Sequence, residues 1–332
     1  MRNRLPVSKL KRKGQSGAMS DQAERDFGPT KLMSLREAIE RFVPDGASIA
    51  MSCALEPLIP FAAGHEIIRR GRRDLTLIGP ISDVLFDQLI GAGCVARIMA
   101  AWAGNVSEGL GHNYRRAAEK GQPRGIEIVD HSNYSMAMAL QAAALGVPYI
   151  PIRSLLGSDI ARDNPGLRPS PSPLDGSPTL LALAVQPDVA ILHVQRADAL
   201  GRAHAWGGLG ICEEAALAAK GVIYIAEEIV APEVILSDPN RVLAPGFKTL
   251  AVVHEPGGAH PSPVQGYYNR DHAAFAEYHQ ATRTPEGFAE WLRAWVLDLP
   301  DRAAYLAKLG DDRWQSLAIQ QHHFAAPVDY GY

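Results

Sequence analysis

Short runs of β-branched and aliphatic residues alternate along this chain with alanine-rich stretches, and this alternation limits the fold more than any other feature. The expected strands are residues 48–52, 75–78, 95–100, 126–129, 149–152, 189–194, 222–226 and 250–254. Strands separated by helices form βα units with a mainly parallel sheet. Several runs are apolar on both faces, as expected when helices cover both sides of a sheet. The sequence predicts an α/β fold with an open, mostly parallel sheet.

Helix signals divide the chain into three parts. Ser34, with Glu37 three residues later, predicts the start of the first helix. Further helices are expected at residues 57–70, 83–90, 133–145, 213–219, 271–280 and 285–297. From Asp271 onward the chain stays helical. We therefore expect a disordered basic N-terminal extension (1–30), an α/β domain (31–270), and a helical C-terminal extension (271–332) packed on the domain or on a partner.

Residues 163–178 contain five prolines, at positions 165, 169, 171, 173 and 178. Neither a helix nor a central strand tolerates that density of proline. We expect a loop, either an ordered active-site flap or a plain surface excursion.

Composition narrows the function classes. The net charge of −3 argues against nucleic acid as the main partner. No apolar run approaches ~18 residues, so we expect no membrane span. The three cysteines, Cys53, Cys94 and Cys212, are too few for a disulfide framework and form no CxxC pair. The expected location is cytoplasmic.

Motifs of self-contained enzymes are missing. The chain has no GxxxxGK[ST], GxSxG or HExxH, and its histidines form no pair at metal-ligand spacing on one helix face. We expect no metal site. Nothing in the sequence supplies a base for Cys53, which favours a small buried hydrophobe over a nucleophile.

Several short motifs follow one another in a fixed order along the chain. They are residues 188–193 (Asp-Val-Ala-Ile-Leu-His), 197–201 (Ala-Asp-Ala-Leu-Gly), 206–208 (Trp-Gly-Gly), 225–230 (Ile-Ala-Glu-Glu-Ile-Val), 245–247 (Pro-Gly-Phe) and 257–262 (Gly-Gly-Ala-His-Pro-Ser). Together they resemble the A (alpha) chain of family I coenzyme A transferases, of the glutaconate CoA-transferase type. The resemblance covers residues 31 to 315. It implies the α/β fold shared with ribose-5-phosphate isomerase and glucosamine-phosphate deaminase.

The resemblance also implies an incomplete active site. In this family the B subunit supplies a glutamate that attacks the acyl-CoA thioester, and CoA is exchanged onto a second carboxylic acid by a ping-pong mechanism. The expected partner is the B subunit, in an α2β2 assembly. The expected substrates are acyl-CoA and a carboxylic acid, with no cofactor besides the coenzyme A thioester. A CoA-thioester (ring-opening) hydrolase or a decarboxylase on the same scaffold is the alternative, and the B chain would distinguish them.

Candidate substrate-binding residues follow the ends of strands, where open α/β sheets bind ligands. They are Ser52 and Cys53, Gly79 and Ser82, Asn105 and Ser107, with His260 from the last motif. Asn105 either donates its amide to an acyl or thioester oxygen or caps a turn. His260 either shapes its loop or contacts substrate or the B subunit.

Asn133 distinguishes transfer from hydrolysis. The resembling ring-opening hydrolases carry a glutamate there as general base, and an amide cannot abstract a proton. Asn133 therefore favours a transferase in which it supports catalysis, although it also suits the N-cap of the next helix.

Two departures from the family pattern bear on the substrate. Ser52, Cys53 and Ala54 replace the usual Gly-Gly-Phe, and Leu58 and Ile59 stand where glutaconate-type chains are basic. We hypothesise an acyl group that is less acidic than glutaconate or that is anchored elsewhere.

Overall fold

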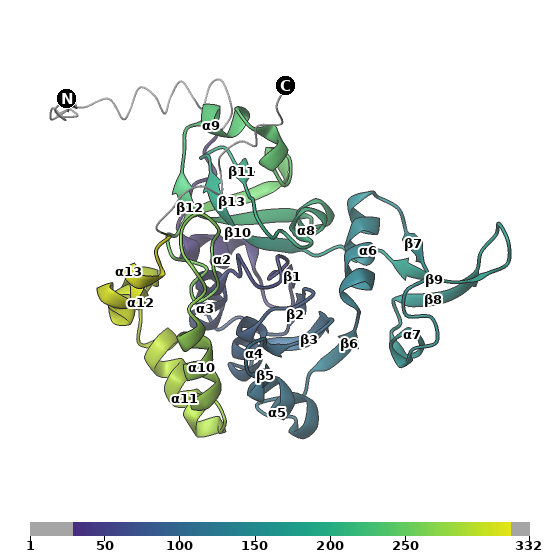
Figure 1. The fold of residues 1–332 in the computed structure, drawn as a ribbon, viewed down its shortest axis with the longest axis horizontal. Helices are drawn as coiled ribbons and strands as arrows, with labels where there is room; N and C mark the ends of the chain where they lie inside the picture. The colour runs from purple at the N-terminus through teal and green to yellow at the C-terminus, as the bar shows by residue number, and fades with distance from the viewer. Residues whose placement is uncertain (1–28, 320–332) are drawn as a thin grey trace, which may run out of the picture. The chain divides into compact units, whose positions relative to one another are not determined.

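A mostly parallel sheet forms the centre of the chain in a computed structural model, which describes residues 29–319 (Figure 1). Its strands follow the order β13-β12-β10-β1-β2-β3-β6, and each neighbouring pair on this path is parallel. The bounds are β1 (Ser48–Ala50), β2 (Leu75–Ile78), β3 (Val95–Ala100), β6 (Glu127–Asp130), β10 (Val189–Ala197), β12 (Gly221–Ile229) and β13 (Thr249–His254). A short strand, β11 (Ala203–His204), pairs antiparallel with β10. The predicted fold class is confirmed.

Helices cover both faces of this sheet. Successive strand residues point to opposite faces, so each strand contributes side chains to two core clusters. Ile49 and Ile223 belong to one core cluster with α2 (Leu35–Phe42), α3 (Phe61–Arg69) and α4 (Val84–Gly91). Their neighbours Ala50 and Val222 belong to a second cluster with α6 (Asn133–Ala144) and α8 (Cys212–Ala218). The strands are therefore apolar on both sides, as predicted.

Two helix starts show how local sequence sets the element bounds. Ser34 is the N-cap of α2, and its side chain accepts a hydrogen bond from the backbone N–H of Glu37. The helix expected from residue 57 begins only at Phe61, because Leu58 has a φ of 57° and Pro60 is the N-cap. Residues 57–60 thus belong to the loop after β1.

The proline-rich segment is partly strand, so the predicted loop over residues 163–178 is wrong. β8 (Leu167–Pro171) and β9 (Pro178–Leu183) form a hairpin, and β7 (Tyr149–Ile152) completes a separate three-stranded antiparallel sheet in the order β7-β9-β8. β8 is an edge strand and Pro178 is the first residue of β9, the two settings in which a strand accepts proline. Figure 1 shows this small sheet beyond α6, at the side of the main sheet.

The C-terminal helices pack on the chain's own core. They are α10 (His272–Ala281), α11 (Pro285–Leu292), a π-helix (Arg293–Leu297), α12 (Arg302–Leu309) and α13 (Asp311–Leu317). Phe275, Phe288 and Val296 belong to the cluster that contains α3 and α4. Within residues 31–319, the extension is therefore not a separate body. The prediction for the basic N-terminal extension falls on residues outside the described range, apart from residues 29 and 30.

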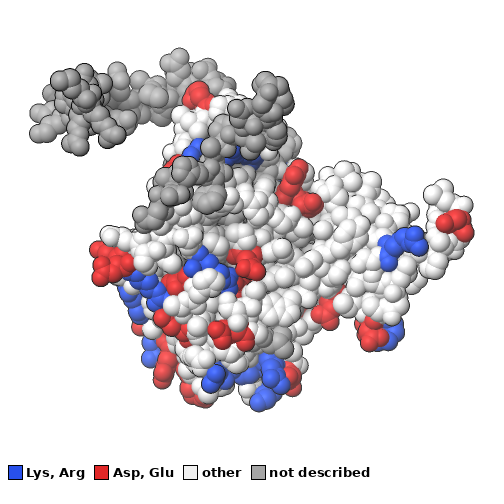
Figure 2. Space-filling model, viewed as in Figure 1, with Lys and Arg blue, Asp and Glu red and all other residues white. Residues whose placement is uncertain are grey.

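The remaining elements are short or peripheral. They are β4 (Gly104–Asn105), β5 (Gly109–Leu110), α5 (His112–Lys120), α7 (Asp159–Asp163), α9 (Pro232–Leu236) and the 3-10 turns Pro239–Arg241 and Gly246–Lys248. Among the helices of residues 29–319, none has the length and apolarity required to cross a bilayer. On the face shown in Figure 2, acidic and basic side chains are interspersed.

Candidate functional site

The loop that follows β1, residues 52–58, has an unusual backbone. Ser52, Leu55 and Leu58 have φ values of 58°, 74° and 57°. For a residue with a side chain, this left-handed region costs roughly 1–2 kcal/mol. Such strain persists only where the surroundings hold it, and it clusters at functional sites. We call this segment the β1 loop.

Two glycines of neighbouring loops hold the start of the β1 loop by close approach. A Cβ atom on Gly210 would lie 2.3 Å from the carbonyl oxygen of Cys53, and one on Gly79 would lie 2.5 Å from that of Met51. The backbone N–H of Ile211 also donates to the Cys53 oxygen, at 2.8 Å. These positions therefore need glycine, and the predicted residue Gly79 packs against Met51, immediately before the β1 loop, rather than presenting a side chain to the loop.

The first three residues of the β1 loop are buried and carry unpaired polar groups. Ser52, Cys53 and Ala54 are all at most 2% exposed. Within residues 29–319, their backbone N–H groups donate no hydrogen bond, and the Ser52 Oγ has no partner. Buried N–H groups are almost always paired, because an unpaired one costs as much as a lost hydrogen bond. Three consecutive unpaired donors point to an anion or a polarised carbonyl oxygen as their partner.

A second segment, the turn at residues 257–262, supports the other end of the β1 loop. The Ser262 Oγ donates to the Glu56 carbonyl and accepts from the Ile59 N–H at 3.3 Å. The Leu58 N–H donates to the Pro263 carbonyl at 3.1 Å. A cavity of about 260 Å³ opens beside this junction. Its walls include Pro57, Leu58, Trp206, Pro263, Gln265 and Tyr268.

The thiol of Cys53 is chemically quiet. Burial, together with the nearby Cys212 and Glu214, raises the pKa of Cys53 well above its usual value. Because the thiolate is the nucleophilic form, a thiol held neutral is inert. Only the backbone of Cys53, not its thiol, is therefore a candidate for binding a ligand.

Asn105 and Ser107 lie in a polar cluster after β3. The Asn105 amide donates to the Phe275 carbonyl at 2.8 Å and its oxygen accepts from the Ser107 N–H at 3.1 Å, so the side chain secures the loop against α10. The Ser107 Oγ accepts from Arg270, whose guanidinium lies 2.6 Å from Asp83. Burial raises the pKa of Asp83, although Arg270 opposes this.

Two other predicted residues lie at the starts of helices. The buried Ser82 Oγ accepts from the Phe86 N–H at 3.1 Å, in the first turn of α4. Asn133 is exposed at the first position of α6, and the N-cap is Ser132, in a capping box with Ser135. The N-cap reading of Asn133 is wrong, because the preceding serine already accepts the orphan N–H. Asn133 follows β6, which is separated from β1 by β2 and β3.

His260 is fully buried inside the protein. Its Nδ1 lies 2.9 Å from the Tyr305 hydroxyl and its Nε2 lies 3.0 Å from Asp271. Burial lowers the pKa of His260 to about 4, despite the hydrogen bond to Asp271. A neutral imidazole held on both nitrogens shapes its turn.

Glu227 is likewise structural. Its carboxylate accepts from the Tyr268 hydroxyl at 2.7 Å and from the Gly257 N–H at 2.9 Å, and lies 2.7 Å from His193. Burial alone would raise the pKa of Glu227, but these hydrogen bonds bring it below its usual value.

The structure thus brings Ser52, Cys53 and Gly79 together and places Asn105 and Ser107 in a separate cluster. Gly210 and Ser262 were missed from the sequence, although both lie in or near the quoted motifs. No group of His, Cys, Asp or Glu side chains within residues 29–319 is arranged to hold a metal ion.

Comparison with known proteins gives a consistent result. Residues 32–255 match the family described as Coenzyme A transferase. The chain is 39% identical to the A subunit of 3-oxoadipate CoA-transferase from Pseudomonas knackmussii, over 85% of this chain and 99% of that protein. It is 33% identical to the A subunit of glutaconate CoA-transferase from Acidaminococcus fermentans, over 87% and 95% of the two chains. The solved structure of the Acidaminococcus fermentans glutaconate CoA-transferase superposes with a TM-score of 0.81 at 32% identity, over 87% and 96% of the chains.

Proposed function

We infer that this chain, which belongs to the coenzyme A transferase family, uses the β1 loop to bind the thioester oxygen of an acyl-CoA. The chain corresponds to the A subunit of a CoA-transferase, and its relatives imply a partner, the B subunit. The observation that carries the proposal is the row of unpaired N–H groups at Ser52, Cys53 and Ala54.

The reaction that we propose is a ping-pong acyl transfer. A glutamate carboxylate from the B subunit first attacks the thioester carbonyl, the C–S bond breaks, and an acyl–glutamyl anhydride and CoA thiolate form. The thiolate attacks the glutamyl carbonyl, releasing the first carboxylic acid, and a second acid then takes CoA by the reverse steps. Each tetrahedral stage carries a negative oxygen, and losing one donor to such an oxygen costs roughly 2.7–4 kcal/mol. The proposal assigns no cofactor besides the coenzyme A thioester.

Asn133 takes a supporting role in this scheme, at a distance from the β1 loop. Its amide cannot remove a proton from water, which favours transfer over hydrolysis. Ser107 and the Arg270–Asp83 pair supply polar groups at the same edge of the sheet.

The apolar residues of the β1 loop bear on the choice of acyl group. Both relatives are named for dicarboxylic acids, yet Leu58 and Ile59 are apolar and buried in this chain. We propose that the acyl group is less acidic than glutaconate or that its distal carboxylate is anchored elsewhere. Turnover of dicarboxylic and monocarboxylic CoA esters decides: a strong preference for the dicarboxylate removes the first alternative.

The test is co-expression with the cognate B subunit. After mixing with acyl-CoA, borohydride or hydroxylamine should modify a glutamate of the B chain, and this chain alone should not exchange CoA. Modification of this chain, or full activity without a partner, refutes the proposal. Release of free CoA without an acceptor acid would identify a hydrolase instead.

We also propose an α2β2 assembly and a cytoplasmic location. All three cysteines are free, as expected in a reducing compartment. Light scattering of the purified complex tests the stoichiometry.

A further inference from the structure

The 257–262 turn connects the β1 loop to the C-terminal helices. Ser262 in the turn, and Pro263 directly after it, form hydrogen bonds with the backbone of Glu56, Leu58 and Ile59. The Gly258 carbonyl also accepts from the Ala62 N–H at 2.8 Å, in the first turn of α3. The turn therefore fixes where the β1 loop ends and where α3 begins.

Arg302 of α12 binds the same turn through two of its carbonyl groups. The Arg302 side chain donates to the Gly257 carbonyl at 2.8 Å through Nε and to the His260 carbonyl through Nη2. Arg302 is 3% exposed and its guanidinium lies 3.9 Å above the ring of Tyr305. A planar guanidinium with several donors can bind two carbonyls at once, which an ammonium does less well.

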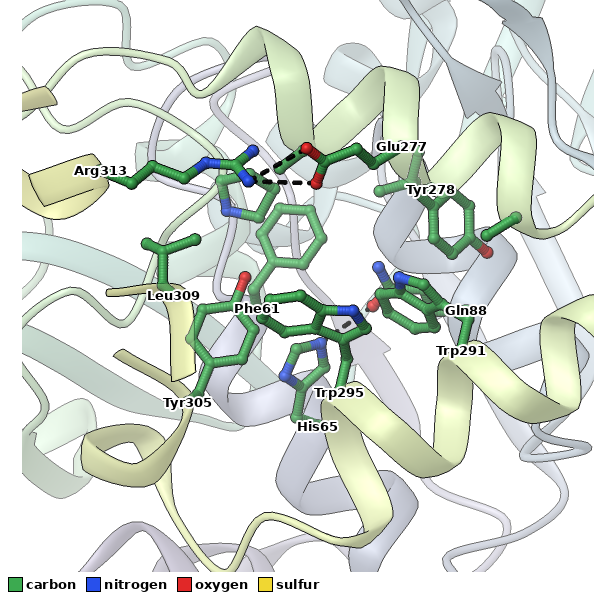
Figure 3. Close-up of a pocket in the computed structure, with 14 residues that line it drawn as sticks. Phe61, His65, Gln88, Glu277, Tyr278, Trp291, Trp295, Tyr305, Leu309 and Arg313 are labelled. Carbon is green, nitrogen blue, oxygen red and sulfur yellow. Dashed lines mark hydrogen bonds and ion pairs between the residues drawn. The ribbon is translucent and has the colours of Figure 1, made fainter. Parts of the chain in front are cut away.

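Packing also joins the C-terminal helices to this turn: the side chains of Leu306 and Trp314 lie close to Gly257, and the rings of Tyr305 and Trp314 pack against His260. Figure 3 shows Tyr305 on the wall of a cavity, beside Phe61 and Trp295, with the Arg313–Glu277 ion pair at its rim. The cavity measures about 140 Å³. Atoms that line a void lose dispersion contacts on that side. The polar contacts of Arg302 and Tyr305 therefore add to this packing and are the ones that fix the orientation of the turn's carbonyls and of His260.

We propose that Arg302 is a positioning residue for the transferase reaction. It fixes the 257–262 turn, and the turn keeps the β1 loop in the left-handed conformation that presents its amides to the thioester oxygen. This inference rests on the proposed function and adds a residue more than 240 positions away in sequence from Ser52.

Arg302→Lys and Arg302→Met, each in complex with the B subunit, test the role. Because the amides act mainly in the transition state, kcat should fall while KM for the acyl-CoA changes little. We expect kcat to fall about 10- to 100-fold in Arg302→Met, less than for direct loss of a donor. Lysine should restore part of the loss.

Arg69→Lys is the matched control. Arg69 is partly buried, with its side chain 9% exposed, and donates to the same extension, at the Val296 and Leu299 carbonyls at 3.4 Å, but it does not touch the turn. It should lower the melting temperature and leave kcat within about twofold, a change of roughly 0.4 kcal/mol in the barrier.

Hydrogen exchange provides a readout that does not need activity. The Leu58 and Ile59 amides, bonded to Pro263 and Ser262, should exchange faster in Arg302→Lys but not in Arg69→Lys. Unchanged exchange there, or a kcat equal to that of Arg69→Lys, overturns the inference. If the wild-type complex transfers no CoA, the proposed function is refuted. The hydrogen-exchange comparison still tests by itself whether Arg302 positions the β1 loop.

Discussion

Replacing Gly210 with alanine tests the β1 loop most directly. Gly210 has a φ of 53°, and the added Cβ would lie 2.3 Å from the Cys53 oxygen and 3.0 Å from the Ala54 Cα. All of these neighbours are backbone atoms, so the β1 loop itself must move. Gly46→Ala is the matched control, because Gly46 has a φ of 79° and a Cβ added there would meet nothing within 4 Å.

The expected magnitudes separate backbone strain from displacement of the loop. The left-handed conformation costs an alanine roughly 1–2 kcal/mol at either position. Forcing an extra methyl group into a packed site adds about 1–3 kcal/mol. Gly210→Ala should therefore lower the unfolding free energy by about 2–5 kcal/mol, and Gly46→Ala by about 1–2 kcal/mol.

Activity should separate the two variants further. If the displaced amides lose one effective donor to the oxyanion, kcat falls about 10²- to 10³-fold in Gly210→Ala. Gly46→Ala should keep kcat within about twofold, because its position is remote from the loop. The assay is CoA exchange by the reconstituted complex, with denaturant unfolding at one protein concentration. If a folded Gly210→Ala complex exchanges CoA as fast as the Gly46→Ala complex, the β1 loop amides do not stabilise the oxyanion.

Three further outcomes are expected. Cys53→Ala should keep CoA exchange within about threefold, since burial keeps the thiol neutral, and native Cys53 should resist alkylation at pH 8, as mass spectrometry would show. Burial lowers the pKa values of His131 and His260 to about 4, so the unfolded state binds more protons than the folded state between pH 6.5 and 4. As the pH falls through this range, the unfolding free energy should decrease by about 1.4 kcal/mol per pH unit for each histidine. Denaturation of His131→Gln should show a shallower fall, and a slope equal to that of wild type would contradict the assignment. Glu227→Gln should destabilise the protein by about 1–3 kcal/mol, since it disturbs a buried hydrogen-bond network, while covalent trapping still modifies the B chain.

The sheet was predictable because its signal is local and repeated. β2 and β3 have the predicted bounds, and so does β7, although β7 lies in the separate antiparallel sheet and not in the parallel one. The proline hairpin was not predictable from composition, because only its edge position makes Pro169 and Pro171 acceptable. The sequence therefore indicates which segments form strands, but not whether a strand lies at the edge or in the middle of a sheet.

The candidate site was predictable only in its location. Strand ends pointed to Ser52, Cys53 and Gly79, which do meet at one edge. The strained φ values, the unpaired amides and the contact from Arg302 depend on tertiary packing, and no local pattern encodes them. Of the two roles considered for Asn133, the N-cap role is wrong, because Ser132, immediately before it, suits that role equally well by residue type.

The small β7-β9-β8 sheet has both of its free edges interrupted by proline. Pro151 lies in the edge strand β7, and Pro169 and Pro171 lie in the opposite edge strand β8. A proline offers no N–H to an incoming strand, and edge prolines are a known defence against uncontrolled strand addition. The sheet is therefore closed to extension by another chain. Any protein that engages it must contact its faces or its hairpin tip, where side chains can select the partner.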